Sequence, residues 1–203
     1  MHFLFQKSLK IGKAIRTDSL LTTSTVSLEK VIFELSQIFL RNLKAARILF
    51  FGNSEINRKI LHFFKNKEID QLTLCTRGVV SAEELLREYH MQVLPWDQKE
   101  KWQDFDIVIC GTTQHEYLIY PEQIQSQQQT KNRIIFDLGV PRNADPRLHR
   151  HPCLTLLNIE ELGSLIEKKQ QIHRMEIAAA EESVRQAVER QLEVFDRKTM
   201  VIA

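Results

Sequence analysis

The sequence predicts an α/β fold in which a doubly wound parallel sheet is followed by a long C-terminal helix. Between residues 47 and 157, short apolar runs of strand length alternate with helical patterns, which is typical of a parallel sheet covered by helices. From Ile159 onward, apolar side chains keep a helical period as far as Phe195, and Gly163 is the only breaker. This last pattern predicts one helix of roughly 35 residues, about 50 Å long.

Composition limits the class of protein. The 203 residues are 43% hydrophobic and 27% charged, and the formal net charge of +2 is too small to indicate nucleic-acid binding. No apolar run approaches the roughly 18 residues that a membrane span requires, and the N-terminus lacks the pattern of a signal peptide. The three cysteines have no metal-binding spacing, so we expect a reduced, cytoplasmic protein without a membrane partner.

The elements are expected to follow one another with few breaks. The apolar segment 3–9 is typical of a helix end with nothing before it to pack on, so we expect the chain to start within a larger protein, with residues 1–24 as a junction. Ser24 or Thr25 would cap a helix from Val26 to about Leu43 that lies against the sheet. The expected strands are 47–51, 72–75, 91–94, 106–110, 133–137 and 153–157, and the intervening helices or turns are 81–88 (capped by Ser81), 98–103 and 121–129.

The stretch from residue 47 to residue 60 is the expected entry unit of a dinucleotide-binding, Rossmann-like domain. A buried strand runs into Gly52 and then into a helix, whose N-terminus would offer unpaired N–H groups to a pyrophosphate. Of the G-x-G-x-x-G pattern only Gly52 remains, because Ser54 and Asn57 replace the other glycines. The turn either still binds its ligand or has kept its shape and lost it. The candidate contacts are Gly52, Asn53, Ser54, Glu55, Ile56 and Asn57.

The end of the second strand indicates which dinucleotide would bind. NAD-binding domains place a carboxylate there for the ribose diol, whereas this chain has Cys75-Thr76-Arg77. A guanidinium binds phosphate as a fork, so Thr76 and Arg77 indicate a 2′-phosphate and therefore NADPH. The alternative is that Arg77 is an exposed loop residue without a ligand.

Three later stretches carry further candidates. Thr112, just after the strand 106–110, would contact the ribose or nicotinamide side, unless it only caps a helix. Gly139, within the stretch 137–146, would lie near the nicotinamide ring, where a side chain would collide. His149, His151 and Cys153 are potential metal ligands, but their spacing is weak evidence, so we predict no metal site.

These stretches together resemble the glutamyl-tRNA reductase family. The resemblance covers nearly the whole chain and implies that residues 25–158 are an NADPH-binding domain and that residues 159–203 are the family's spinal helix. It rests on residues 16–27, 52–57, 76–77, 137–146 and 157–162, which occur in that family's order, and on Arg174, Ala180 and Glu181.

The resemblance implies the hydride-donating domain of an enzyme that reduces glutamyl-tRNA to glutamate-1-semialdehyde in tetrapyrrole (porphyrin) biosynthesis. In that family a cysteine of an N-terminal catalytic domain forms a thioester, and NADPH delivers hydride. Cys75, Cys110 and Cys153 do not match that cysteine, so the resemblance implies no catalytic residue in this chain, which would be inactive alone. Glutamyl-tRNA, a homodimer formed through the long helix and an aminomutase are the implied partners.

Two other classes of function remain open. One is a different NADP-dependent dehydrogenase domain, such as a sirohaem-pathway or shikimate-type enzyme, against which the long helix argues. The other is a degenerate Rossmann interaction module without a cofactor, whose long helix recruits a partner. The loss of two glycines supports this module, and failure to bind any dinucleotide would favour it.

Overall fold

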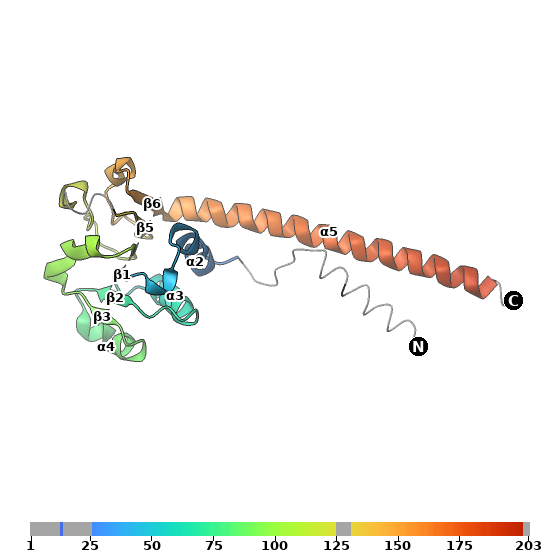
Figure 1. Ribbon diagram of the computed structural model, residues 1–203, viewed down its shortest axis with the longest axis horizontal. Helices are drawn as coiled ribbons and strands as arrows, with labels where there is room; N and C mark the ends of the chain where they lie inside the picture. Colours follow the sequence, from blue (N-terminus) through green and yellow to red (C-terminus); the bar gives the residue numbers. More distant parts are fainter. Residues whose placement is uncertain (1–12, 14–25, 125–130, 201–203) are drawn as a thin grey trace. The chain divides into compact units, whose positions relative to one another are not determined.

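The structure, a computed structural model, describes residue 13 and residues 26–124 and 131–200 of the chain. Its centre is a six-stranded sheet in the order β3-β2-β1-β4-β5-β6, in which every neighbouring pair of strands is parallel (Figure 1). Each strand lies within one residue of a predicted strand at either end, so the predicted parallel sheet is confirmed. The strands are β1 (Ile48–Phe51), β2 (Leu72–Cys75), β3 (Gln92–Val93), β4 (Ile107–Cys110), β5 (Arg133–Asp137) and β6 (Leu154–Asn158).

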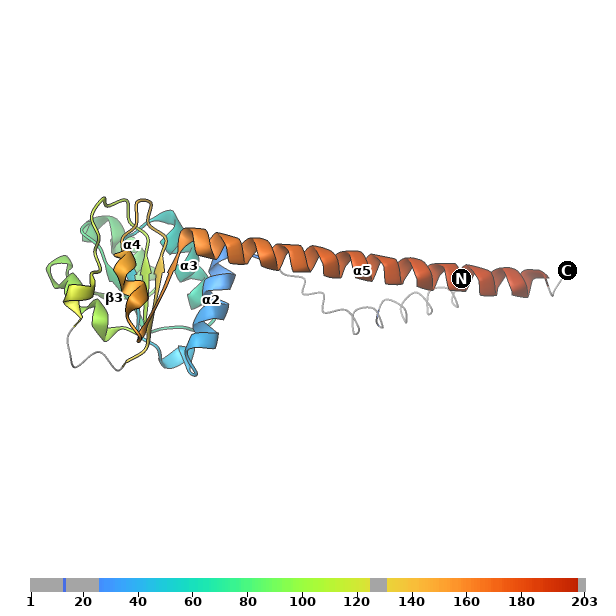
Figure 2. The same cartoon turned by 90° about the horizontal axis from the view of Figure 1, so that it is seen from above.

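Helices and 3-10 turns connect these strands. In both views α2 and α3 lie side by side, and α2 also contacts β5, as expected of a helix that lies against the sheet (Figure 2). The α-helices are α2 (Leu28–Phe39), α3 (Glu55–Lys65), α4 (Val79–Glu88) and α5 (Ile159–Met200), and the 3-10 helices include η1 (Leu43–Ala45), η2 (Trp96–Asp104), η3 (Pro121–Gln123) and η5 (Pro146–Arg150).

The predicted capping residues are wrong at two places. The N-cap of α2 is Ser27, whereas Ser24 and Thr25 lie outside the described residues. The N-cap of α4 is Gly78, because the chain turns into the helix immediately after β2, and Ser81 is therefore inside the helix. The helix α2 also ends earlier than predicted, at Phe39, since Leu40 is extended. The expected segment 3–9 and much of 121–129 lie outside the described residues.

The long C-terminal helix is confirmed and is longer than predicted. The helix α5 has 42 residues, which corresponds to about 63 Å at 1.5 Å per residue. Its start is fixed by a capping box, in which Asn158 Oδ1 accepts from the N–H groups of Glu160 and Glu161 at 2.9 and 3.0 Å. In return, Glu161 Oε2 accepts from the Asn158 N–H at 2.8 Å. The Asn-x-x-Glu sequence therefore marks the point where β6 becomes α5.

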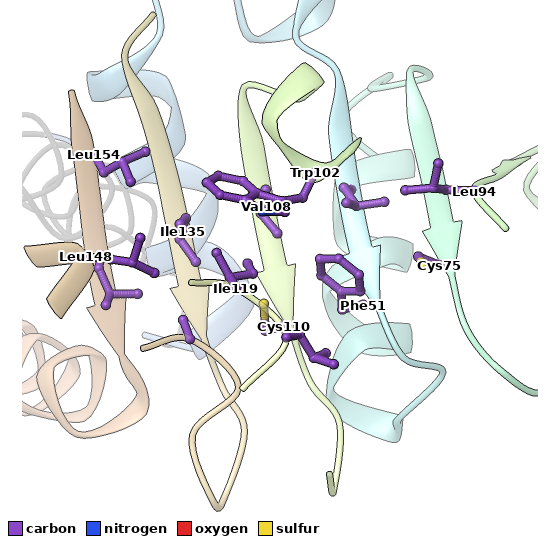
Figure 3. Packing of buried hydrophobic residues seen from close by; sticks show 14 residues of the cluster. Phe51, Cys75, Leu94, Trp102, Val108, Cys110, Ile119, Ile135, Leu148 and Leu154 are labelled. Carbon is purple, nitrogen blue, oxygen red and sulfur yellow. The ribbon is translucent and has the colours of Figure 1, made fainter. Parts of the chain in front are cut away.

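Alternating strand residues build two apolar layers, one on each face of the sheet. On one face the rings of Phe63 and Phe64 from α3 make edge contacts with Phe33 of α2, at centroid distances of 5.6 and 5.5 Å. On the other face Trp102 of η2 packs against the strands, as Figure 3 shows. The second layer contains Leu49, Phe51, Cys75, Leu94, Trp102, Val108, Cys110, Leu118, Ile119, Ile135, Ala144, Leu148, Leu154 and Leu156.

The chain divides into two compact units. One unit is Ser27–Ile166, which contains the whole sheet, and the other includes α5 from Glu167 onward. Among the described residues, no helix is both long enough and apolar enough to cross a membrane.

Candidate functional site

The turn after β1 lies at the point where the strand order reverses. The carboxyl ends of the parallel strands share one edge of the sheet, and open α/β sheets bind ligands between the strands where the order changes, here β1 and β4. Gly52 lies there with a φ of 86°, and its N–H donates to Cys75 O at 2.9 Å. A Cβ at Gly52 would lie 2.7 Å from Thr112 Cγ2 and 2.8 Å from Gly111 O. The turn therefore requires glycine for its backbone conformation and for space.

The two residues that replace glycines stabilise this turn from within. Ser54 is the N-cap of α3, and its hydroxyl oxygen accepts from the Asn57 N–H at 3.3 Å. Asn57 is buried, and its amide nitrogen donates to Phe51 O at 2.7 Å and to Gly52 O at 2.9 Å. Asn57 thus ties the first turn of α3 to the end of β1. Among the described residues, its amide oxygen has no hydrogen-bond partner.

Gly111, which directly follows β4, gives these two side chains their space. A Cβ at Gly111 would lie 2.5 Å from Asn57 Oδ1 and 2.9 Å from Ser54 Oγ. In the usual pattern the third glycine lets helix and strand pack closely. Here the small residue lies at the end of the neighbouring strand instead, so the turn keeps its packing. Apart from the Asn57 N–H, which the Ser54 hydroxyl caps, the first N–H groups of α3 have no intrahelical partner and lie at this edge, so the residues fit an anionic pyrophosphate.

The other predicted residues of the turn lie nearer its surface. Asn53 Oδ1 accepts from Arg58 Nε at 2.9 Å, which holds a guanidinium beside the turn. Glu55 is exposed, and its carboxylate pairs with Lys59 at 2.8 Å, an interaction that lowers the pKa of Glu55. This ion pair offsets a negative charge that would otherwise oppose a phosphate. Ile56 is half-buried.

Thr76 and Arg77 have different environments at the end of β2. Thr76 is buried, and its Oγ1 accepts from the Gly78 N–H at 3.3 Å, so it shapes the turn into α4. Arg77 is exposed, and its Nε, Nη1 and Nη2 lie 2.9, 3.2 and 2.5 Å from the Gln114 amide oxygen when that oxygen faces the guanidinium. The Cζ of Arg77 lies 5.5 Å from the centroid of the Trp96 ring. The guanidinium is therefore held at the end of β2, on the ribose side of a Rossmann site.

Asn143 links the loops that follow β4 and β5. Its Oδ1 accepts from the Thr112 N–H at 3.0 Å, and its Nδ2 donates to the backbone oxygen of Gln114 at 3.5 Å. The Thr112 hydroxyl oxygen accepts from the Gln114 N–H at 3.3 Å. A Cβ at Gly139 would collide with the Asn143 amide and would lie 2.8 Å from Pro141 O. The space beside Gly139 is therefore used by the protein's own loop.

Asp137 holds that loop in place from the end of β5. Its carboxylate is buried and accepts from the N–H groups of Gly139, Asn143 and Ala144 at 3.0 to 3.2 Å. Burial raises the pKa of Asp137, and the hydrogen bonds from these three N–H groups act against that rise. Asp137 thus positions both Gly139 and Asn143.

Two cysteines lie at the same edge but in the apolar layer. Cys75 and Cys110 are buried at the ends of β2 and β4. Burial raises the pKa of the Cys75 thiol to about 12, with Lys99 acting against the rise and Asp97 adding to it. Burial also raises the pKa of Cys110 well above its ordinary value. Since the thiolate is the nucleophile, neither thiol suits covalent catalysis near neutral pH.

Native-state labelling should therefore separate the three thiols. At pH 8 only about one in ten thousand molecules of a thiol with a pKa near 12 carries the thiolate. We expect the half-buried Cys153 to react with iodoacetamide well before Cys75 and Cys110. Timed labelling followed by peptide mass spectrometry measures the order, with urea-unfolded protein as the control. Rapid labelling of Cys75 in the native protein would contradict this assignment.

The sequence offers His149, His151 and Cys153 as potential metal ligands. Within the described residues, no group of three or more His, Cys, Asp or Glu side chains is placed to hold a metal ion. His151 instead acts locally, since its Nδ1 accepts from the Cys153 N–H at 3.3 Å.

Sequence reasoning missed residues that complete this edge of the sheet. Trp96 and Gln114 contact Arg77, and Asn143 contacts Thr112, although none of the three belongs to the glycine motif. Lys99 joins them by its contact with Trp96. Only their position in the sequence could have indicated them, because Trp96 comes soon after β3 and Gln114 soon after β4. A search of all residues that follow the carboxyl ends of the expected strands would have found both.

Comparison with protein families gives a match that spans the whole sheet. The family model described as shikimate / quinate 5-dehydrogenase matches residues 34–165. The glutamyl-tRNA reductase of Cyanophora paradoxa is 28% identical over 183 residues, which are 88% of this chain and 42% of that protein. This chain therefore spans less than half the length of that curated relative.

Solved structures show the same fold. Glutamyl-tRNA reductase from Methanopyrus kandleri has a TM-score of 0.75 and 18% identity, over 98% of this chain and 52% of that chain. The nucleotide-binding domain of glutamyl-tRNA reductase from Thermoplasma volcanium has a TM-score of 0.56 and 15% identity, over 74% of this chain and 99% of that chain. The predicted Rossmann-like α/β fold with a long C-terminal helix is confirmed.

Proposed function

The chain belongs to the shikimate / quinate 5-dehydrogenase family, and from this premise we propose that it is the NADPH-binding domain of a glutamyl-tRNA reductase. The observation that carries the proposal is the guanidinium of Arg77 at the end of β2, where a carboxylate would serve NAD. The similarity of 88% of the chain to a protein named glutamyl-tRNA reductase supports the choice within the family.

The residues have separate roles in this proposal. Gly52 and the N-terminus of α3 would hold the pyrophosphate, because the glycine leaves space and the helix offers N–H groups and a positive dipole. Arg77 would bind the 2′-phosphate, and Thr112 would face the ribose or nicotinamide side. Asp137 and Asn143 would keep the loops at the nicotinamide side in position. When bound, NADPH supplies hydride.

The reaction of the whole enzyme is also a proposal. A cysteine of a separate catalytic domain would attack the glutamyl ester and release tRNA, forming a glutamyl thioester. The domain would hold NADPH so that hydride passes to the thioester carbonyl, which frees the thiol and gives glutamate-1-semialdehyde. The burial of Cys75 and Cys110 argues against either of them as that nucleophile. A homodimer through α5, an aminomutase partner and a cytoplasmic location stay predictions.

A cofactor-free interaction module is the second candidate, because Ser54 and Asn57 replace two glycines. The environment of Asn57 weakens this candidate, since its amide is directed to the carbonyl groups at the end of β1 and is buried there. Ser54 also uses its hydroxyl to cap α3. Both replacements are thus accommodated within the protein.

Titration with NADPH and NADH, read by reduced-nicotinamide fluorescence, tests the proposal. We expect preferential binding of NADPH. Charge-assisted hydrogen bonds contribute about 1.5–3 kcal/mol, so Arg77→Ala should weaken NADPH binding by roughly 10- to 100-fold and leave NADH binding nearly unchanged.

Arg87→Ala is the matched control, since Arg87 is an exposed arginine of α4 that pairs with Glu83. It should bind both dinucleotides as the unaltered chain does. Equal loss of NADPH and NADH binding in Arg77→Ala would contradict the role of Arg77, and failure of the unaltered chain to bind either would favour the interaction module.

A further inference from the structure

The Trp96 ring has two cationic side chains near it, from different parts of the chain. Trp96 is the first residue of η2, separated from β3 by Leu94 and Pro95, and its ring meets the Phe51 ring edge-on at a centroid distance of 6.4 Å. The Arg77 guanidinium carbon lies 5.5 Å from the Trp96 centroid, and Lys99 Nζ lies 5.9 Å from it. Both distances are within the range of cation–π attraction. One half-buried ring therefore holds two positive charges in place.

The strand order shows which part of a dinucleotide these charges would meet. The strand β3 lies beside β2 and on the far side of β2 from β1. The start of η2 is thus beside the end of β2, where the adenosine ribose binds in this fold, and away from the pyrophosphate turn between β1 and β4. The action of Lys99 on the pKa of Cys75, the last residue of β2, agrees with this position.

The other groups at this end are polar or charged. Gln114 reaches Arg77 from the loop after β4, with its amide oxygen facing the guanidinium. Asp97 carries a carboxylate next to Trp96 and acts on the pKa of Cys75 in the sense opposite to Lys99. Two cations against one carboxylate leave this cluster of Arg77, Trp96, Asp97 and Lys99 with a net positive charge. Like charges gathered on one ring are stabilised by a multivalent anion.

We propose that Lys99 is a second determinant of NADPH specificity, which binds the 2′-phosphate together with Arg77 on the Trp96 ring. This rests on the proposed function of the domain. A 2′-phosphate carries close to two negative charges near neutral pH, so a fork from Arg77 and a point charge from Lys99 complement it. The site that recognises the 2′-phosphate then includes residues of both the turn after β2 and η2.

Lys99→Gln should weaken the binding of only those ligands that carry a 2′-phosphate. A single charge pair near 4 Å in water is worth about 1 kcal/mol, which is about 5-fold in affinity. We expect Lys99→Gln to weaken binding of NADPH and of 2′,5′-ADP by about this factor and to leave NADH binding unchanged. Lys99→Arg should restore most of the loss. Calorimetric titration of the whole chain measures all three ligands.

Lys101→Gln is the matched control, because Lys101 is an exposed lysine of the same η2 that donates to Gln98 Oε1 at 2.7 Å. It should bind all three ligands as the unaltered chain does. Unchanged NADPH and 2′,5′-ADP binding in Lys99→Gln would overturn the role of Lys99 while leaving the proposed function intact. Equal weakening of NADPH and NADH would overturn it as well. Failure of the unaltered chain to bind any of the three would overturn both.

Discussion

Replacing Gly52 by valine should lower the free energy of unfolding by about 2–5 kcal/mol. About 1–2 kcal/mol comes from placing a side chain in the left-handed backbone region, since Gly52 has a φ of 86°. About 1–3 kcal/mol more comes from overpacking, because the Cβ would lie 2.7 Å from Thr112 Cγ2 and 2.8 Å from Gly111 O. Urea denaturation followed by circular dichroism measures the change.

Gly163→Ala provides the control for Gly52→Val. Gly163 lies in α5, and a Cβ there would meet nothing within 4 Å. Alanine favours a helix over glycine by about 1 kcal/mol, so this variant should be as stable as the unaltered chain or slightly more stable. A Gly52→Val protein with unaltered stability would contradict the geometry of the turn. Loss of NADPH binding in Gly52→Val is informative about the ligand only after its folding has been measured.

Replacing Asp137 by alanine should cost about 3–5 kcal/mol, because three buried N–H groups would lose their acceptor. Asp137→Asn should not restore the stability. Each carboxylate oxygen of Asp137 accepts from backbone N–H groups, so an amide nitrogen at either position would face a donor. Chemical denaturation measures both variants, and their NADPH affinities should fall as the loop loses its position.

Asp70→Ala is the control for these variants. Asp70 carries an exposed carboxylate that pairs with Lys65 at 2.9 Å, and exposed pairs contribute little to stability, so the change should be within about 0.5 kcal/mol. An Asp137→Asn protein as stable as the unaltered chain would show that the loop does not depend on two accepting oxygens.

The strands could be predicted from the sequence because each is a short buried run between polar turns. For β2 and β5, the predicted and observed bounds are the same. The start of α4 could not be predicted in the same way, since Ser81 has the sequence of a good cap but the turn at Thr76 and Gly78 begins the helix earlier. Two possible helix starts compete at such a place, and the direction in which the chain leaves the strand decides which one is used.

The candidate site was predictable only in part, for a related reason. The positions of Gly52 and Arg77 follow from their place in the sequence pattern. The effect of Asn57 depends on Gly111, which is 54 residues further along the chain and meets it only in the folded sheet. The cluster around Trp96 likewise joins the ends of β2 and β3 through a ring whose neighbours no single stretch of sequence reveals.

Hydrogen bonds connect the loop after β5 with the turn after β2, across the edge of the sheet where the strands end. They run from Asn143 through Gln114 to Arg77. A ligand that binds one arrangement of these loops more tightly at one end would therefore favour the matching arrangement at the other end. Thermodynamic reciprocity requires the two effects to be equal. If a ligand at the ribose end orders the loop at residues 139–143, a ligand at that loop raises the affinity of the ribose end by the same coupling free energy. The two ends would then act as one cooperative unit rather than as independent subsites.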